Sequence, residues 1–345
     1  MRPSARAAEI EGEDGAVYHG GDLGAARSLF PDAPTPWLDL STGINATPYP
    51  TEAFSQDALT RLPDAHALMR LLTAAASAYG ARDMQQIVAA PGTQALIQWL
   101  PKLFPARRVA ILGFGYQEYP TLWRAAGAEA FVTDDVADLT SPGVDVAIVV
   151  NPNNPDGRLI DPQNLAEIAT RLARRGGLLI VDEAFMDLIP PGTSLIPLLP
   201  ERGALVLRSF GKAYGLAGIR LGFAITGFDL AEKLRTALGP WAVSGPAIEI
   251  GATALADKDW LVNAAARLAQ LAARLDALLT AAGFSILGGT PLFRLARHQH
   301  AAQWFQKFGR HGILTRPFPE RPDWLRFGLP GAEADWARLA EALKS

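Results

Sequence analysis

Short, almost wholly apolar segments that alternate with helical segments constrain the fold of this chain more than any other feature. Residues 108–112 (RVAIL) and 144–150 (VDVAIVV) are rich in β-branched and other aliphatic side chains, as are 178–181 (LLIV) and 204–207 (ALVL). Consecutive apolar positions are typical of strands that are covered on both faces. Residues 161–175 predict a helix, with apolar side chains spaced along one face. Strands that alternate with helices predict an α/β fold with a mostly parallel central sheet and helices on both faces.

The composition changes along the chain and indicates a division into domains. The 345 residues predict about two domains of roughly 150 residues each. Residues 1–50 are rich in turn formers and predict an irregular arm that contributes to the active site and to the small domain. We expect the large domain over residues 51–240. A smaller α+β domain is expected over residues 241–345, where a helical stretch at 246–282 precedes several short strand candidates.

Charge and residue usage exclude several classes of function. The 32 Lys and Arg residues nearly balance 35 Asp and Glu residues, for a net charge of −3, so no basic excess points to nucleic acid or to an anionic membrane. No apolar run reaches the roughly 18 to 20 residues of a membrane span, and residues 1–15 lack the apolar stretch of a signal peptide. The chain has no cysteine, which fits a reducing compartment, and no histidine–carboxylate spacing predicts a metal site. We therefore expect a soluble, cytoplasmic enzyme.

Polar side chains follow three of the predicted strands, at the edge where parallel α/β sheets bind ligands. Asn154 lies in NPNNPDG, Asp182 ends LLIVD, and Lys212 follows ALVLRSF. Each has an ordinary alternative, because Asn-Pro forms turns, an aspartate can cap a helix, and most lysines are solvated. Together they offer an amide for a ring oxygen, a carboxylate for a ring nitrogen and a partly desolvated lysine for an aldehyde.

The segment PGTQ predicts an anion site, because it joins a strand to a helix whose first amides have no partner within the helix. Gly92 and Thr93 of this segment, with Ser209 and Arg220, predict a phosphate cradle. An aldehyde, a ring nitrogen, a ring oxygen and a phosphate are the functional groups of pyridoxal 5′-phosphate. These features together predict a site for that cofactor.

The motifs NPNNPDG, DEAF and SFGKAYGLAGIRLG, in this order, resemble those of fold-type I pyridoxal-phosphate enzymes. The branch that they resemble contains the histidinol-phosphate aminotransferases and the threonine-phosphate decarboxylases of cobalamin biosynthesis, and the resemblance runs from about Tyr18 to Gly331. It implies the fold-type I transferase fold. It also implies Lys212 as the Schiff-base lysine, Asp182 as the partner of the pyridine nitrogen and Asn154 as the partner of the ring hydroxyl. The phosphate-binding residues that it implies are Gly92, Thr93, Ser209 and Arg220. The aromatic residue that it implies to stack on the cofactor ring is Tyr116.

The same resemblance implies a substrate pocket. Arg326 in WLRFG matches the arginine that binds the substrate α-carboxylate, and Arg316 in GILTRPF matches one that contacts the substrate phosphate. The segments YHGGD and DLSTGIN resemble pocket segments of the decarboxylases, which implies site roles for His19, Gly20 and Asn45. By itself, HGGD is more simply explained as a turn that carries a solvated histidine.

Two positions depart from the family pattern, and both concern the cofactor. Leu62 stands where the family often has a tyrosine that reaches the cofactor phosphate of the neighbouring subunit, which a leucine cannot bind. Phe185 stands where the aminotransferases commonly have a tyrosine bonded to the ring oxygen, so Asn154 would act alone there. The family also implies a homodimer, since its active sites lie near the subunit interface.

The resemblance favours a carbon–carbon lyase that converts O-phospho-L-threonine to (R)-1-amino-2-propanol phosphate in cobalamin biosynthesis. Two alternatives stay open. A histidinol-phosphate aminotransferase would share the lysine, the aspartate and the arginines, but Phe185 and YHGGD count against it. A non-catalytic binding protein of the same fold is disfavoured by the presence of Lys212 and Asp182 and by the lack of a DNA-binding segment.

Overall fold

The structure is a computed structural model, and it describes residues 20–51 and 54–344. Contacts group the chain into two compact units, of which residues 47–266 form one and residues 1–46 with 267–345 form the other. The N-terminal residues thus belong to the same unit as the C-terminal residues. The bounds at 50 and 240 that the sequence indicates for an arm and two domains stay a prediction.

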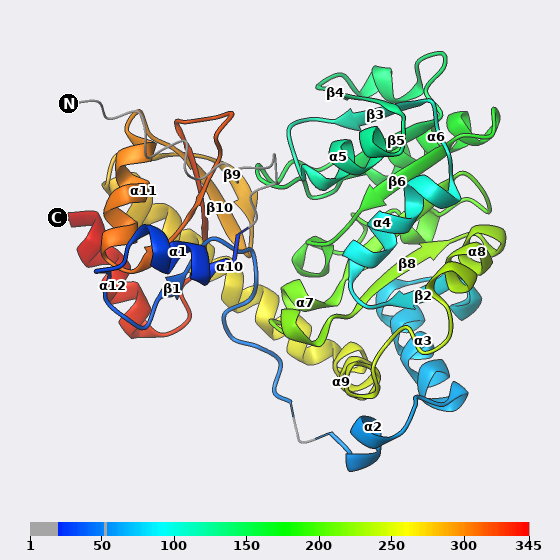
Figure 1. The fold of residues 1–345 in the computed structure, drawn as a ribbon, viewed down its shortest axis with the longest axis horizontal. Helices are drawn as coiled ribbons and strands as arrows, with labels where there is room; N and C mark the ends of the chain where they lie inside the picture. The colour runs from blue at the N-terminus through cyan, green and yellow to red at the C-terminus, as the bar shows by residue number, and fades with distance from the viewer. Residues whose placement is uncertain (1–19, 52–53, 345) are drawn as a thin grey trace. The chain divides into compact units, whose positions relative to one another are not determined.

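A seven-stranded sheet lies at the centre of the unit formed by residues 47–266 (Figure 1). Its strand order is β2-β8-β7-β6-β5-β3-β4, in which β8 runs antiparallel to both of its neighbours and the other pairs are parallel. The mostly parallel sheet that the sequence predicts is therefore confirmed. The strands are β2 Ile87–Ala90, β3 Arg108–Leu112, β4 Glu129–Thr133, β5 Val146–Val150, β6 Leu178–Asp182, β7 Ala204–Ser209 and β8 Gly222–Thr226.

Helices cover both faces of this sheet. Alternate strand residues such as Ile111, Ile148 and Ile180 pack with α4, α5 and α8 in one buried cluster, and their neighbours Ala147 and Val181 are also buried. This is the reason for the unbroken apolar runs in the sequence. The helices of the unit are α2 Gln56–Thr60, α3 Ala65–Tyr79, α4 Thr93–Leu103, α5 Glu118–Ala125, α6 Pro162–Ala173, α7 Phe210–Ala213, α8 Phe228–Leu238, α9 Gly245–Ala256 and the first turns of α10 Lys258–Ala281.

The register of the parallel strands fixes which residues emerge together at the carboxyl edge of the sheet. Asp182 at the end of β6 is aligned with Val150 at the end of β5 and with Leu207 in β7. The segments that follow these three strands therefore leave the sheet side by side, as is usual at the ligand-binding edge of α/β sheets.

The second unit contains a four-stranded antiparallel sheet in the order β12-β13-β10-β9. Helices α1 Leu23–Leu29, α11 Ala301–Arg310 and α12 Glu333–Lys344 belong to this unit. The short strand β1 Leu38–Asp39 pairs in parallel with β11 Ile313–Leu314. The sheet strands are β9 Ser285–Thr290, β10 Phe293–Arg297, β12 Arg316–Pro317 and β13 Trp324–Gly328.

Two segments differ from the sequence-based expectation. The N-terminal stretch is not irregular throughout, because Asp22 caps α1 by accepting a hydrogen bond of 2.9 Å from Ala25 N. The helical stretch expected at 246–282 is divided, because Asp257 ends α9 and accepts a 3.0 Å bond from Trp260 N at the start of α10. Within residues 20–51 and 54–344, none of the helices combines the length and apolar character that crossing a membrane requires.

Candidate active site

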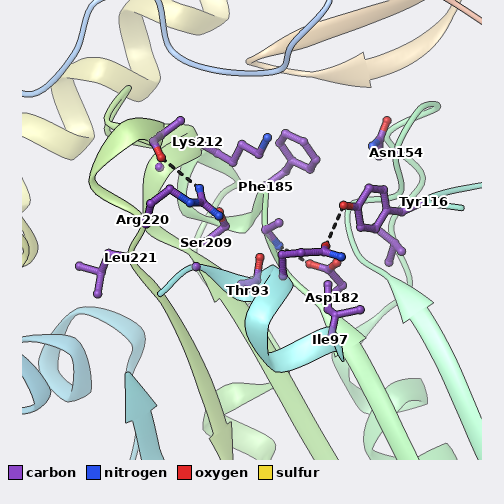
Figure 2. Close-up of a pocket in the computed structure, with 16 residues that line it drawn as sticks. Thr93, Ile97, Tyr116, Asn154, Asp182, Phe185, Ser209, Lys212, Arg220 and Leu221 are labelled. Atoms are coloured by element: carbon purple, nitrogen blue, oxygen red, sulfur yellow. Dashed lines mark hydrogen bonds between the residues drawn. The ribbon is translucent and has the colours of Figure 1, made fainter. Parts of the chain in front are cut away.

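A pocket of about 180 Å³ lies at the carboxyl edge of the seven-stranded sheet, within the unit of residues 47–266 (Figure 2). All of the residues that the sequence assigns to the cofactor line this pocket. They are Gly92, Thr93, Tyr116, Asn154, Asp182, Ser209, Lys212 and Arg220. The structure therefore brings these side chains together, and their individual roles stay predictions.

The ends of neighbouring strands position the central groups. Asp182 and Ser209 are the last residues of β6 and β7, and Lys212 follows within the single turn of α7. Asn154 lies in the loop after β5. That loop is held by the Asn153 amide, which donates to Phe114 O at 3.1 Å and to Asp156 Oδ1 at 2.9 Å.

Asp182 is a buried carboxylate in the floor of the pocket, with 5% of its surface exposed. Its Oδ2 accepts a hydrogen bond of 2.8 Å from the Tyr119 hydroxyl, and its Oδ1 accepts one of 3.0 Å from Ala184 N. Burial raises the pKa of Asp182, although the Tyr119 bond, the Ala184 bond and the positive charge of Lys212 act in the opposite direction. A cation that entered the pocket beside Asp182 would therefore offset the unfavourable burial of its charge.

The first turn of α4 and Arg220 form a cradle of hydrogen-bond donors. Gly92 is the N-cap of α4 and has no side chain to bond the first amides of the helix, so these amides face the pocket. The guanidinium of Arg220 lies so close that a Cβ on Gly92 would collide with it. A Cβ on Gly222 would lie 2.5 Å from Thr93 N. Glycine at both positions thus permits a close approach of strand, helix and arginine around a site for an anion.

Tyr116 and Phe185 supply aromatic surface to the pocket. The Tyr116 hydroxyl donates to Gln94 Oε1 at 2.9 Å, and Gln94 Nε2 in turn donates to Glu118 Oε2 at 2.8 Å, which fixes the orientation of the tyrosine ring. Lys212 is half-buried, and its Nζ lies 5.7 Å from the centre of the Phe185 ring, toward which the lysine extends in Figure 2.

The predicted substrate residues belong to the other unit, formed by residues 1–46 and 267–345. Arg316 of β12 is aligned with Arg326 of β13. Arg326 Nη2 donates to Ser41 O at 2.6 Å, and a Cβ on Gly20 would lie 2.5 Å from that same oxygen. Asn45, another predicted substrate residue, is buried. His19, the last of them, lies outside the described residues.

Burial and the positive charge of Arg316 together lower the pKa of Arg326 to about 9, and Asp39 opposes this shift. Two guanidinium groups on adjacent strands, one of them buried, favour an anionic ligand that relieves their repulsion.

Comparison with known proteins identifies the family. The sequence profile of aminotransferase class I and II matches residues 35–343. The chain belongs to the aminotransferase class I and II family. Two similar relatives are threonine-phosphate decarboxylases, one from Sinorhizobium sp. at 43% identity over 95% of this chain and 97% of that protein, and one from Pseudomonas aeruginosa at 42% identity over the same shares, 95% and 97%. A solved histidinol-phosphate aminotransferase from Clostridium acetobutylicum, 21% identical, superposes with a TM-score of 0.77 over 89% of this chain and 98% of that one.

Membership of the aminotransferase class I and II family confirms the predicted fold-type I fold, and the chain is a pyridoxal-phosphate-dependent enzyme. The pocket fits that cofactor. The α4 amides and Arg220 suit its phosphate, the buried carboxylate of Asp182 suits a protonated ring nitrogen, and the amine of Lys212 suits its aldehyde.

Several residues around this pocket were not predicted from the sequence. Tyr119 lies one helical turn after Tyr116 and bonds Asp182 from behind. Arg208 forms buried ion pairs with Glu183 at 2.9 Å and with Asp187 at 2.5 Å. Arg208 and Glu183 are sequence neighbours of Ser209 and Asp182, and successive side chains of a strand point to opposite sides. A charged residue inside the apolar segment ALVLRSF is the sequence feature that could have identified this ion pair.

Proposed function

We propose that this family member is a carbon–carbon lyase that decarboxylates O-phospho-L-threonine to (R)-1-amino-2-propanol phosphate, as a step of cobalamin biosynthesis. The observation that carries the proposal is the 43% and 42% identity to two threonine-phosphate decarboxylases over nearly the full length of both chains. The pocket in residues 47–266 supports the cofactor chemistry, and the arginine pair of the other unit supports an anionic substrate.

The chemistry that bound pyridoxal phosphate supplies is an electron sink for a bond that breaks at the substrate α-carbon. Lys212 Nζ would bind the cofactor aldehyde, and Asp182 would hold the proton on the pyridine nitrogen. Asn154 would bind the ring oxygen, and Tyr116 would supply the aromatic surface for the cofactor ring. Gly92, Thr93, Ser209 and Arg220 bind the phosphate.

The second unit supplies the groups that would bind the substrate. Of these, Arg326 would bind the α-carboxylate and Arg316 the phosphate, and His19, Gly20 and Asn45 stay proposed substrate-binding residues. In decarboxylation the bond from the α-carbon to the carboxylate breaks, CO₂ leaves, and a proton takes the place of CO₂ on the α-carbon. Lys212 Nζ, once the substrate amine has displaced it from the aldehyde, would supply that proton. The bond that stands perpendicular to the cofactor ring is the one that breaks, so the placement of the carboxylate by Arg326 decides between decarboxylation and amino transfer.

Release of CO₂ from phosphothreonine tests this proposal. The purified holoenzyme is incubated with phosphothreonine, with and without 2-oxoglutarate, and Lys212→Ala serves as the control. We expect CO₂ and 1-amino-2-propanol phosphate in equal amounts, with no need for 2-oxoglutarate. Obligatory amino transfer from histidinol phosphate to 2-oxoglutarate would contradict the proposal and favour an aminotransferase. A cofactor-loaded protein that converts neither compound would favour a binding protein.

We further propose that the enzyme is a homodimer. Leu62, at the position where the family often has a tyrosine that reaches the neighbouring subunit, is 66% exposed, and Trp241 is 59% exposed. Pro63, Leu68 and Trp241 line one apolar depression of about 320 Å³. Exposed apolar surface of this kind is typical of protein interfaces. The cytoplasmic location expected from the sequence stays a prediction.

A further inference from the structure

Tyr119 lies behind the wall of the pocket rather than in it. It is fully buried in α5, one turn after Tyr116, and does not line the pocket. The Tyr119 hydroxyl donates its hydrogen bond of 2.8 Å to Asp182 Oδ2. Tyr119 thus contacts two residues of the pocket, Asp182 through its hydroxyl and Tyr116 through the edge of its ring, at 6.0 Å between ring centres. The hydrogen bond to Asp182 is the polar one of these contacts.

The surroundings of Tyr119 and Asp182 make the Tyr119 hydroxyl a hydrogen-bond donor to the charged Asp182 carboxylate. Burial and the charge of Asp182 raise the pKa of Tyr119 well above its usual value, so the phenol keeps its proton. Burial raises the pKa of Asp182, and the Tyr119 bond is the strongest influence that lowers it, ahead of Ala184 N and Lys212. The titratable groups that face Asp182 are thus Tyr119 and Lys212, and those that face Tyr119 are Asp182 and Tyr116.

We propose that Tyr119 is a positioning residue that keeps the Asp182 carboxylate ionised and oriented toward the pyridine nitrogen of the cofactor. The inference rests on the role proposed above for Asp182. A hydrogen bond to an ionised carboxylate is stronger than one to its protonated form, so the hydroxyl stabilises the charged state of Asp182 selectively. Ala184 N holds Oδ1 and Tyr119 holds Oδ2, and the two bonds together fix the plane of the carboxyl group.

The variant Tyr119→Phe removes this bond and leaves the ring in the core. Tyr79 offers a matched control, because it is also buried and its hydroxyl has no hydrogen-bond partner among the described residues. Tyr79→Phe therefore removes a buried hydroxyl without removing a bond to Asp182. Asp182→Asn serves as the reference for loss of the charge itself.

The first measurement uses the apo-protein, whose unfolding is followed at several pH values from acid to alkaline. The folded-state pKa of Asp182 lies above its unfolded value, so ionisation of Asp182 destabilises the fold as the pH rises from the unfolded pKa through the folded one. Loss of the Tyr119 hydroxyl raises this pKa further. We expect the stability difference between the unchanged protein and Tyr119→Phe to grow with pH, and the difference for Tyr79→Phe to stay constant.

The second measurement uses the holoenzyme. We expect kcat of Tyr119→Phe to fall by about tenfold to a hundredfold, the range for a hydrogen bond to a charged group, with an unchanged KM for the substrate. If Tyr119→Phe folds poorly, 3-fluorotyrosine at position 119 keeps the ring and makes the hydroxyl a stronger donor. That replacement should lower the Asp182 pKa and move the pH dependence of unfolding in the opposite direction.

The outcomes separate this inference from the proposed function. If Tyr119→Phe matches Tyr79→Phe in pH dependence and in kcat while Asp182→Asn loses most of its rate, the role of Tyr119 is wrong and that of Asp182 stands. If Asp182→Asn also keeps its rate, the proposed role of Asp182 fails first. An unchanged pH dependence with 3-fluorotyrosine would overturn the inference independently of catalysis.

Discussion

The replacement Gly92→Ala tests the phosphate cradle at its most constrained backbone position. Gly92 has a φ of 83° and a ψ of 159°, a conformation that is essentially restricted to glycine and that destabilises any other residue by about 1–3 kcal/mol. The added Cβ would also collide with the guanidinium of Arg220. Alanine at position 92 therefore strains the backbone and displaces the arginine.

The backbone strain changes the stability of the fold, whereas the displacement of Arg220 changes the affinity for the cofactor. The backbone strain is present with or without cofactor, so it lowers the free energy of unfolding. Displacement of Arg220 removes a hydrogen bond between charged groups, worth about 1.5–3 kcal/mol, and does so only for the cofactor complex. Since about 1.4 kcal/mol corresponds to a factor of ten, the dissociation constant of pyridoxal phosphate should rise by about tenfold to a hundredfold.

Gly127→Ala is the matched control, because Gly127 has a φ of 90° and an added Cβ would have no atom of the described residues within 4 Å. Both variants should unfold at a lower temperature than the unchanged protein. Only Gly92→Ala should bind pyridoxal phosphate more weakly in an equilibrium titration of the apo-protein. Equal cofactor affinities for Gly92→Ala and the unchanged protein would refute the reasoning that Arg220 and Gly92 share a phosphate site.

Three further predictions concern the amine, the substrate arginine and the subunit interface. Lys212→Ala should abolish both turnover and the absorbance of the bound cofactor, and a yellow, active variant would contradict its assignment. Burial lowers the pKa of Arg326 to about 9, so its positive charge is lost as the pH rises through that value. The KM for the anionic substrate should therefore increase there, and a flat KM profile speaks against this role. Trp241→Asp should convert the dimer to monomers in sedimentation, because it places a charge on exposed apolar surface, and an unchanged sedimentation coefficient would contradict that interface.

The central strands were predictable because burial on both faces leaves a strong pattern in the sequence. β5 Val146–Val150 and β6 Leu178–Asp182 are buried at every position. The strand β4 Glu129–Thr133 was missed because it lies at the edge of the sheet and is only partly buried. Helix α1 Leu23–Leu29 was missed because only Ala26 is buried, which leaves no apolar periodicity to detect.

The pocket residues were predictable for a related reason, since they directly follow strands whose positions are clear. Lys212 and Asn154 each follow a strand, and the carboxyl ends of parallel strands lie at one edge of the sheet, so the topology alone predicts that the two residues lie at that edge. Tyr119 and Gln94 act through contacts that cross from one helix to another segment, Tyr119 to Asp182 and Gln94 to Tyr116. No spacing in the sequence encodes such contacts, because they depend on how α4 and α5 pack on the sheet.

The buried ion pairs of Arg208 select the strand register that builds the site. Asp182 faces the pocket while Glu183 faces away from it, so a slip of β6 by one residue would exchange the two side chains. Arg208 can pair with Glu183 at 2.9 Å only in the observed register, where Asp182 is aligned with Leu207. Breaking such a pair leaves a buried charge without compensation, at about 3–5 kcal/mol. The same two strand ends thus supply the cofactor-facing groups on one side and, on the other, the charges that make every alternative register unfavourable.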